Sequence, residues 1–189
     1  AEGEMADGEM ADGEMADGEM ADGEMADGEM ADGEMADDEM VAMELPAWQT
    51  LPLTDARTGQ AFTLADFAGK TVFVEPMATW CSNCRRQLNN VKEAKAQFGD
   101  DVVFVALSVE TNISGEELAN YAEAEGFDWT FAVLTPEMLQ ELAGAFGQTI
   151  SNPPATPHFI IHPDGAVSAL VTGIEPAADI AAQIAAAKG

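Results

Sequence analysis

Past residue 45, the chain alternates between short, unbroken hydrophobic runs and longer segments in which hydrophobic positions recur every three or four residues. The short runs are rich in β-branched and aromatic residues, which is typical of strands buried on both sides. They cover residues 71–74, 102–109, 129–133, 158–162 and 166–171. The longer segments predict helices with one apolar face, and they begin near residues 82, 114, 136 and 175.

Local signals indicate where these elements begin and end. Ser114 and Glu117 have the spacing of a capping box, and Thr135 followed by a proline is typical of a helix N-terminus. The run Pro163-Asp164-Gly165 predicts a tight turn between the last two strands. Because strands alternate with helices, we expect an α/β fold, with a central mixed sheet flanked by helices on both faces.

The first 45 residues follow a different pattern, in which the unit Glu-Met-Ala-Asp-Gly repeats from Glu4 onward. A period of five fits neither a helix nor a strand, and a glycine in every unit disfavours a helix. An ordered solenoid of so few short repeats would bury little surface, and its charges would repel one another. We therefore predict a disordered arm over residues 1–45 and a folded domain over residues 46–189.

Acidic side chains outnumber basic ones by 35 to 7, and the arm holds 18 of the acids but no Lys or Arg. The net charge of −28 argues against binding to nucleic acid or to anionic membranes, since both need clustered basic residues. No apolar run approaches about 18 residues, so no membrane-spanning segment is expected. The methionines and carboxylates of the arm suit weak binding of Cu(I) or Ca²⁺, and a solubilising spacer is the alternative.

The chain has two cysteines, and they stand three residues apart in Trp80-Cys81-Ser82-Asn83-Cys84, between a predicted strand and a predicted helix. A helix N-terminus at Cys81 would stabilise its thiolate and lower the pKa of its thiol. Cys84 is then within reach to form a disulfide with it. Two arginines follow directly and either favour the thiolate or only form a solvated helix face. The pair therefore predicts redox chemistry that needs no cofactor, rather than two structural thiols or half of a zinc site.

The run from Val72 to Cys84 resembles the active-site segment of thioredoxin-fold proteins, and most of all the TlpA/ResA-type extracytoplasmic thiol–disulfide oxidoreductases, in which Ala-Thr-Trp-Cys-x-x-Cys is common. Residues 58–70 and 156–165 also resemble that group, so the resemblance covers roughly residues 47–187. It implies a thioredoxin-like domain that exchanges electrons with protein disulfides, a protein thiol or disulfide substrate, and an upstream electron donor. An extracytoplasmic location after removal of a signal peptide is expected, with the cytoplasm as the alternative.

The resemblance also implies roles for single residues. Cys81 would attack the substrate disulfide, and Cys84 would resolve the mixed disulfide and pair with Cys81. Glu75 would be a buried acid under the cysteines, with a raised pKa, that exchanges a proton with Cys84. The alternative is an exposed glutamate at a strand end that Pro76 disturbs.

A second set of expected residues lies near the start of the last sheet segment. Pro157 would be the cis-proline that faces the disulfide, although Pro153 or Pro154 could take that place. Thr156 would offer its backbone to the substrate chain. Two more residues are expected to flank the substrate-binding surface, with a buried histidine as the alternative for the second: Trp80 and His158.

Three other classes of protein also have to be compared with these residues: peroxiredoxins, copper proteins, and surface or assembly proteins. The spacing of Pro76, Thr79 and Cys81 does not match the peroxidatic motif of peroxiredoxins. A Sco-like copper protein would carry Cys-x-x-x-Cys, which this chain lacks, but the Met-rich arm leaves open a module that carries copper or serves a copper-site protein. A third alternative is a surface or assembly protein that uses the repeat arm.

Overall fold

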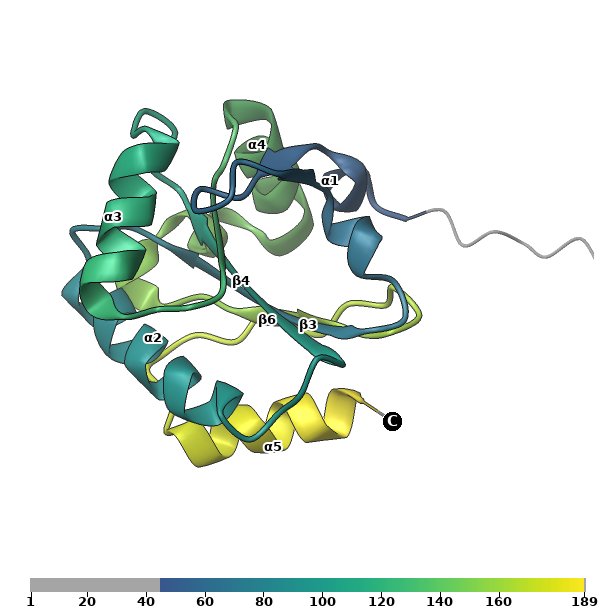
Figure 1. The fold of residues 1–189 in the computed structure, drawn as a ribbon. Coiled ribbons are helices and arrows are strands. Elements are labelled where there is room, and N and C mark those ends of the chain that lie inside the picture. The colour runs from purple at the N-terminus through teal and green to yellow at the C-terminus, as the bar shows by residue number, and fades with distance from the viewer. Residues whose placement is uncertain (1–44, 189) are drawn as a thin grey trace, which may run out of the picture. The chain divides into compact units, whose positions relative to one another are not determined.

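The computed structural model describes residues 45–188, so the predictions about the repeat arm fall outside the described part of the chain. Its centre is a four-stranded sheet with the strand order β5-β4-β3-β6. Strands β3, β4 and β5 run parallel, and β6 pairs antiparallel with β3 (Figure 1). The bounds are Thr71–Met77 for β3, Val102–Ser108 for β4, Thr130–Val133 for β5 and Phe159–Ile161 for β6.

Helices cover both faces of this sheet, which confirms the predicted architecture (Figure 1). One face carries α2 (Ser82–Lys95), α3 (Gly115–Glu125) and α5 (Ala177–Ala187), and the other carries α1 (Ala47–Thr50) and α4 (Pro136–Phe146). The predicted caps are present, since Ser114 and Glu117 form a capping box and the Thr135 hydroxyl accepts the N–H of Met138 at 3.1 Å. No helix among residues 45–188 is long and apolar enough to cross a membrane.

Short elements connect these layers. A two-stranded antiparallel hairpin precedes the main sheet, and three 3₁₀ turns lie between the larger elements. The hairpin consists of β1 (Leu53–Thr54) and β2 (Ala61–Phe62). The 3₁₀ turns are η1 (Leu64–Phe67), η2 (Gln148–Ser151) and η3 (Pro153–Ala155).

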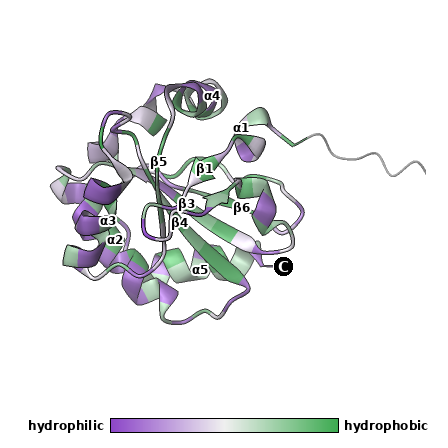
Figure 2. Cartoon of the chain, turned by 45° about the horizontal axis from the view of Figure 1, so that its top comes forward, coloured by the Kyte–Doolittle hydropathy of each residue, from purple (hydrophilic) through white to green (hydrophobic). Residues whose placement is uncertain are grey.

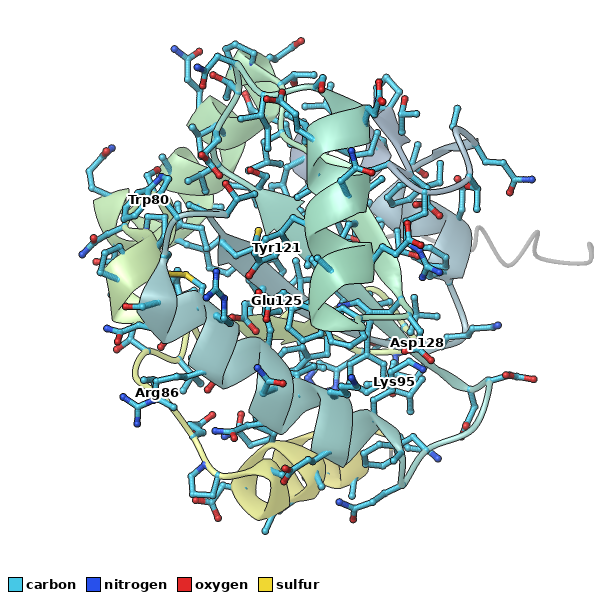
Figure 3. The ribbon with its side chains drawn as sticks, turned by 60° about the vertical axis from the view of Figure 1, so that its left-hand side comes forward. Trp80, Arg86, Lys95, Tyr121, Glu125 and Asp128 are labelled. Carbon is cyan, nitrogen blue, oxygen red and sulfur yellow. A yellow bond between two sulfur atoms is a disulfide. The ribbon has the colours of Figure 1, made fainter. Side chains whose placement is uncertain are left out.

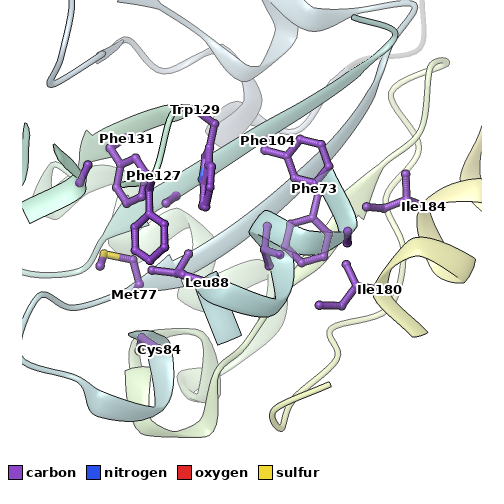
Figure 4. Close-up of a cluster of buried hydrophobic side chains, with 14 of the residues drawn as sticks. Phe73, Met77, Cys84, Leu88, Phe104, Phe127, Trp129, Phe131, Ile180 and Ile184 are labelled. Atoms are coloured by element: carbon purple, nitrogen blue, oxygen red, sulfur yellow. The ribbon is translucent and has the colours of Figure 1, made fainter. Parts of the chain in front are cut away.

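Strand β3 is buried along its whole length because it lies between two hydrophobic clusters. Val72 and Val74 belong to the cluster under α1 and α4, whereas Phe73 and Met77 belong to the cluster under α2, α3 and α5. Figure 2 shows the hydrophobic colour along the strands, and Figure 4 shows Phe73 and Met77 in the second cluster. Since side chains alternate along a strand, Glu75 lies on the same face as Phe73 and Met77, toward α2.

The prediction that Pro76 disturbs the strand end is wrong, because β3 continues through Pro76 to Met77. The carbonyl oxygen of Met77 accepts the N–H of Val109 at 2.9 Å, so the backbone of Met77 faces β4. By alternation, the backbone of Pro76 faces the other edge, where pairing with β6 ends at Val74. A missing N–H at that position removes no ladder hydrogen bond.

The predicted last strand over residues 166–171 is also not formed as a regular strand. The turn is present, since Gly165 has a φ of 87° and its N–H donates to His162. After it, only isolated bridges join the segment to β6, at Val167 and at Val171. The N–H of Ile160 donates to the Ser168 hydroxyl at 2.9 Å, so a side chain takes the place of a ladder carbonyl group there.

Candidate active site

The two cysteines lie where β3 ends and α2 begins, and they form a disulfide with a Cα–Cα distance of 5.3 Å. Cys81 is the N-cap residue of α2, and its sulfur lies 3.1 Å from the backbone nitrogen of Cys84, with the N–H directed at it. Unpaired N–H groups at a helix N-terminus stabilise a negative charge at the cap position. This geometry favours a Cys81 thiolate once the disulfide is reduced.

Trp80 stands beside the disulfide with 65% of its surface exposed, and it is the only large hydrophobic side chain in residues 45–188 that is exposed. Both cysteines are buried, and Arg85 and Arg86 follow them as exposed residues of α2. Figure 3 shows Arg86 pointing away from the domain. An exposed indole beside a buried disulfide offers an apolar contact to a partner chain. The exposed position of Trp80 agrees with its expected place at the substrate surface.

Glu75 is buried, with 1% of its surface exposed, and neither carboxyl oxygen has a hydrogen-bond partner among the described residues. Burial raises the pKa of Glu75 well above its ordinary value, because the charged form loses its hydration. The alternative of an exposed glutamate at a strand end is therefore wrong. The carboxyl group lies on the face of β3 that packs toward α2, which carries Cys84.

The prediction of a cis-proline is wrong, because no peptide bond within residues 45–188 is cis. Pro157 follows a trans bond, and the chain turns instead through η3 and through Thr156, which has a left-handed φ of 45°. The carbonyl oxygen of Pro153 lies 3.2 Å from the sulfur of Cys84. Pro153 is therefore the proline whose carbonyl group faces the redox pair.

The backbone of Thr156 is not free to pair with a substrate chain in this structure. Its N–H donates to the carbonyl oxygen of Pro153 at 2.7 Å, and its own carbonyl oxygen lies 3.0 Å from Nδ1 of His158. The residue is also fully buried. The expectation that Thr156 binds the substrate fails here because the turn satisfies both of its backbone groups internally.

His158 is fully buried and does not line the surface, so the alternative of a core histidine is correct. Its Nε2 lies 2.6 Å from Oε2 of Glu175, and its ring centroid lies 5.3 Å from that of Phe73. Glu175 is itself fixed by Gln183, whose side chain donates to both carboxylate oxygens at 2.8 and 2.9 Å. The histidine thus connects the turn beside Cys84 to the segment that leads into α5.

Glu110 has a structural role at the site that sequence reasoning missed. One of its carboxylate oxygens accepts both the backbone N–H of Thr79 at 2.6 Å and the Thr79 hydroxyl at 2.9 Å. Thr79 lies two residues before Cys81, so this contact holds the loop between β3 and α2. A signal was available, because Glu110 follows β4, and the carboxyl ends of adjacent parallel strands meet at one edge of a sheet.

Two residues of α3, Tyr121 and Glu125, lie beside the first turns of α2, and the sequence analysis did not identify them. Nε of Arg85 forms a salt bridge of 3.0 Å with Glu125 of α3, so the positive charge of this arginine is paired with a carboxylate. Tyr121, one turn earlier on α3, has a buried hydroxyl group with no hydrogen-bond partner among residues 45–188. Burial raises the pKa of Tyr121, the nearby Arg85 lowers it, and the negative charges of Glu125 and Glu75 raise it.

No group of three or more His, Cys, Asp or Glu side chains within residues 45–188 is arranged to hold a metal ion. The methionines and carboxylates of the repeat arm lie outside that range, so weak cation binding there stays a prediction.

The family model described as Redoxin matches residues 37–184. The chain is 28% identical over 128 residues to the thiol-disulfide oxidoreductase ResA of Geobacillus kaustophilus (strain HTA426), which covers 68% of each protein. It is 30% identical over 77 residues to the thioredoxin-like protein YneN of Bacillus subtilis (strain 168). That match covers 41% of this chain and 45% of YneN, so the chain spans less than half the length of that relative.

Among solved structures, the fold is similar to a thiol:disulfide interchange protein of the thioredoxin family from Chlorobium tepidum TLS. The TM-score is 0.61 at 24% identity, over 74% of this chain and 93% of that one. This likeness confirms the thioredoxin-like fold that the resemblance implied. Because the family model matches most of the sequence, from before the first helix into the last one, the chain belongs to the redoxin family.

Proposed function

We propose that this protein is a thiol–disulfide oxidoreductase that exchanges electrons with protein disulfides through Cys81 and Cys84. The observation that carries the proposal is the position of Cys81, whose sulfur caps α2 and faces the N–H of Cys84 at 3.1 Å. The exposed indole of Trp80 beside it supports a protein partner rather than a small molecule in a closed pocket. Similarity to ResA, whose name states this activity, agrees with the assignment.

In the reducing direction, each turnover moves two electrons from the cysteine pair to the substrate disulfide. The Cys81 thiolate attacks one substrate sulfur, which forms a mixed disulfide and releases the other substrate sulfur as a thiolate. Cys84 then loses its proton and attacks the sulfur of Cys81, which releases the second substrate thiolate. The products are the Cys81–Cys84 disulfide and a reduced substrate, and an upstream electron donor restores the two thiols.

Glu75 is the proposed acceptor of the Cys84 proton in the second step. Its carboxyl group is buried on the α2 side of β3, and its raised pKa makes the carboxylate a stronger base than an ordinary glutamate. The absence of any hydrogen-bond partner among the described residues leaves both of its oxygens able to accept a proton. Resolution by Cys84 is therefore the step that should depend on Glu75.

The proposal extends to setting and partners, where the support is the family alone. The protein would meet a protein thiol or disulfide substrate in an extracytoplasmic compartment and receive electrons from an upstream donor. The acidic arm would remain outside the catalytic step and would bind cations weakly at most. The same steps in reverse oxidise a substrate dithiol, so the reduction potentials of the partners set the direction of electron flow.

The test is reduction of insulin disulfides by the full chain with dithiothreitol as donor. Wild-type protein should accelerate insulin precipitation, and Cys81→Ser should not. Cys84→Ser should accumulate a mixed disulfide with the substrate, visible on a non-reducing gel. Ser82→Ala is the matched control, because it changes the neighbouring exposed residue without removing a sulfur. An active Cys81→Ser variant would refute the proposed mechanism.

The role of Glu75 is tested separately by stopped-flow kinetics with acid quench. Glu75→Gln keeps the shape of the side chain but cannot accept a proton. Formation of the mixed disulfide should keep its rate, while resolution should slow, since general-base assistance is typically worth about 10²–10⁴-fold. Resolution at the wild-type rate from pH 6 to 9 would remove Glu75 from the mechanism and leave the rest of the proposal intact.

A further inference from the structure

The turn beside Cys84 is fastened to the rest of the domain by His158. Thr156, just before Pro157, adopts a left-handed backbone with a φ of 45°, which is uncommon for any residue except glycine and disfavoured before a proline. Such a conformation persists only where its surroundings hold it. Two hydrogen bonds hold it: the Thr156 N–H donates to the carbonyl oxygen of Pro153 at 2.7 Å, and the Thr156 carbonyl oxygen accepts Nδ1–H of His158 at 3.0 Å.

The hydrogen-bond pattern of the histidine assigns its protons. A carbonyl oxygen can only accept, so Nδ1 must carry the proton that Thr156 receives. Nε2 lies 2.6 Å from Oε2 of Glu175, and a proton must lie between these two atoms as well. Glu175 therefore fixes the orientation of the ring and directs Nδ1–H at Thr156. The ring cannot rotate freely, because it is fully buried and packs against Phe73.

Glu175 is in turn tied to the helix that carries Cys84. Its backbone N–H donates to the side chain of Gln87 at 2.9 Å, and its carbonyl oxygen accepts the side-chain N–H of Asn90 at 2.7 Å. Both residues belong to α2. The turn and the redox helix are thus joined at three points. These are the contact of Pro153 with Cys84, the bond from the Asn83 side chain to the carbonyl oxygen of Pro154 at 3.0 Å, and the chain through His158 and Glu175.

We propose that His158 is a positioning residue that keeps the Pro153 carbonyl group against the sulfur of Cys84 and thereby sets the reduction potential of the Cys81–Cys84 pair. In the disulfide, Cys84 has no proton to donate. In the reduced protein its S–H can donate to the Pro153 carbonyl oxygen, which lies 3.2 Å from that sulfur. This bond stabilises the reduced form alone, so weakening it makes the pair harder to reduce. The inference deepens the proposed function, on which it rests.

The experiment measures the equilibrium of the protein's own disulfide in glutathione buffers. Two glutathione thiols transfer two electrons and two protons to the Cys81–Cys84 disulfide, which gives two protein thiols and one glutathione disulfide. Asparagine places an N–H near the position of Nδ1, whereas glutamine places one near the position of Nε2. His158→Asn can keep the bond to Thr156, and His158→Gln can keep only the bond to Glu175.

His158→Gln should shift the equilibrium toward the disulfide by about threefold to tenfold, which corresponds to ~15–30 mV at 29.6 mV per tenfold change. His158→Asn should remain within about twofold of the wild type, although both variants lose packing against Phe73. His162→Gln is the matched control, because His162 lies beyond β6 and contacts Ala187 instead of the turn. Equal shifts in both His158 variants, or a wild-type equilibrium in a folded His158→Gln, would overturn the inference.

A measurement on the unaltered protein covers the case in which a variant does not fold. Long-range ¹H–¹⁵N spectra of the imidazole rings report which nitrogens carry protons. We expect a protonated Nδ1 in His158, and an unprotonated Nδ1 would contradict the inference. None of these results depends on substrate turnover. Failure of the wild type to reduce insulin would count against the proposed function alone.

Discussion

A single carboxylate oxygen of Glu110 accepts two hydrogen bonds from Thr79, one from its backbone N–H at 2.6 Å and one from its hydroxyl at 2.9 Å. The two residues are 31 positions apart in the chain. Their contact joins the end of β4 to the loop that presents Trp80 and Cys81. The loop is also held by Ala78, which is buried in the core and whose carbonyl oxygen accepts the N–H of Cys81 at 3.1 Å.

We expect Glu110→Ala to lower the free energy of unfolding by about 2 kcal/mol, because hydrogen bonds to a charged group contribute about 1.5–3 kcal/mol and this one is only partly buried. Glu110→Gln keeps one acceptor oxygen and should lose about half as much. Urea unfolding measures both. Glu93→Ala, at an exposed position of α2, is the control and should change the free energy of unfolding little. A loss in Glu110→Ala no larger than that of Glu93→Ala would show that the contact does not stabilise the loop.

The buried carboxyl group of Glu75 should make stability depend on pH. Because burial raises its native pKa above the ordinary value of about 4.5, the native state holds a proton that the unfolded state has released. From about pH 4.5 up to the native pKa, this group therefore lowers the free energy of unfolding as pH rises, by at most about 1.4 kcal/mol per pH unit.

Glu75→Gln removes this decline, so its stability advantage over the wild type should grow as pH rises. Urea unfolding of both oxidised proteins between pH 5 and 8 measures the difference, in which the many other carboxylates cancel. Glu93→Gln should follow the wild-type curve. A constant difference between Glu75→Gln and the wild type across this range would mean that Glu75 keeps its ordinary pKa.

Tyr121 is the only tyrosine in the chain, so its ionisation can be followed directly by tyrosinate absorbance. Burial, together with the nearby carboxylates of Glu125 and Glu75, raises its pKa above 10.0 despite the opposing effect of Arg85. We expect a titration midpoint above that value, and a midpoint at or below it would contradict the burial of the hydroxyl group.

Removal of the same hydroxyl group should cost no stability. Tyr121→Phe deletes a buried oxygen that has no partner among the described residues, so the free energy of unfolding should stay constant or rise by up to ~1 kcal/mol. Tyr121→Leu also removes the aromatic contact with Phe127, whose ring centroid lies 6.2 Å away, and should be destabilising. A clear loss of stability in Tyr121→Phe would indicate a hydrogen bond to the hydroxyl, for example from the guanidinium of Arg85, which lowers the pKa of Tyr121.

Deletion of residues 1–44 should leave the domain intact. Leu45 is kept because it contacts the turn at Gly165, where an added β-carbon would lie 2.7 Å from Cδ2 of Leu45. The core of the described residues begins at Trp48, so the change in unfolding free energy should stay within about 0.5 kcal/mol, or ~2 °C in Tm. Calorimetry and insulin reduction by the shortened chain measure this, and a loss of several degrees would show that the arm packs on the domain.

Residue types and their spacing were enough to predict the features that depend on near neighbours in the chain. Ser114 and Thr135 cap their helices through residues three positions away, and a run of apolar residues is enough to place β3 and β4 in the core. The redox pair belongs to the same class, because two cysteines three residues apart at a helix start need no distant partner to meet. These choices are local, so local chemistry decides them.

Features that depend on segments far apart in the chain could be seen only in the folded domain. Pro76 fits inside β3 because pairing with β6 stops at Val74, two residues earlier, and Glu75 is buried because α2 covers that face of the strand. The bonds of Glu110 to Thr79 and of Glu175 to His158 join residues whose types do not reveal their partners. The expectation of a cis bond at Pro157 failed at a turn in which Thr156 is left-handed and bonded to His158. His158 is itself oriented by Glu175, 17 residues further along the chain, and nothing in the residues of the turn reveals that partner.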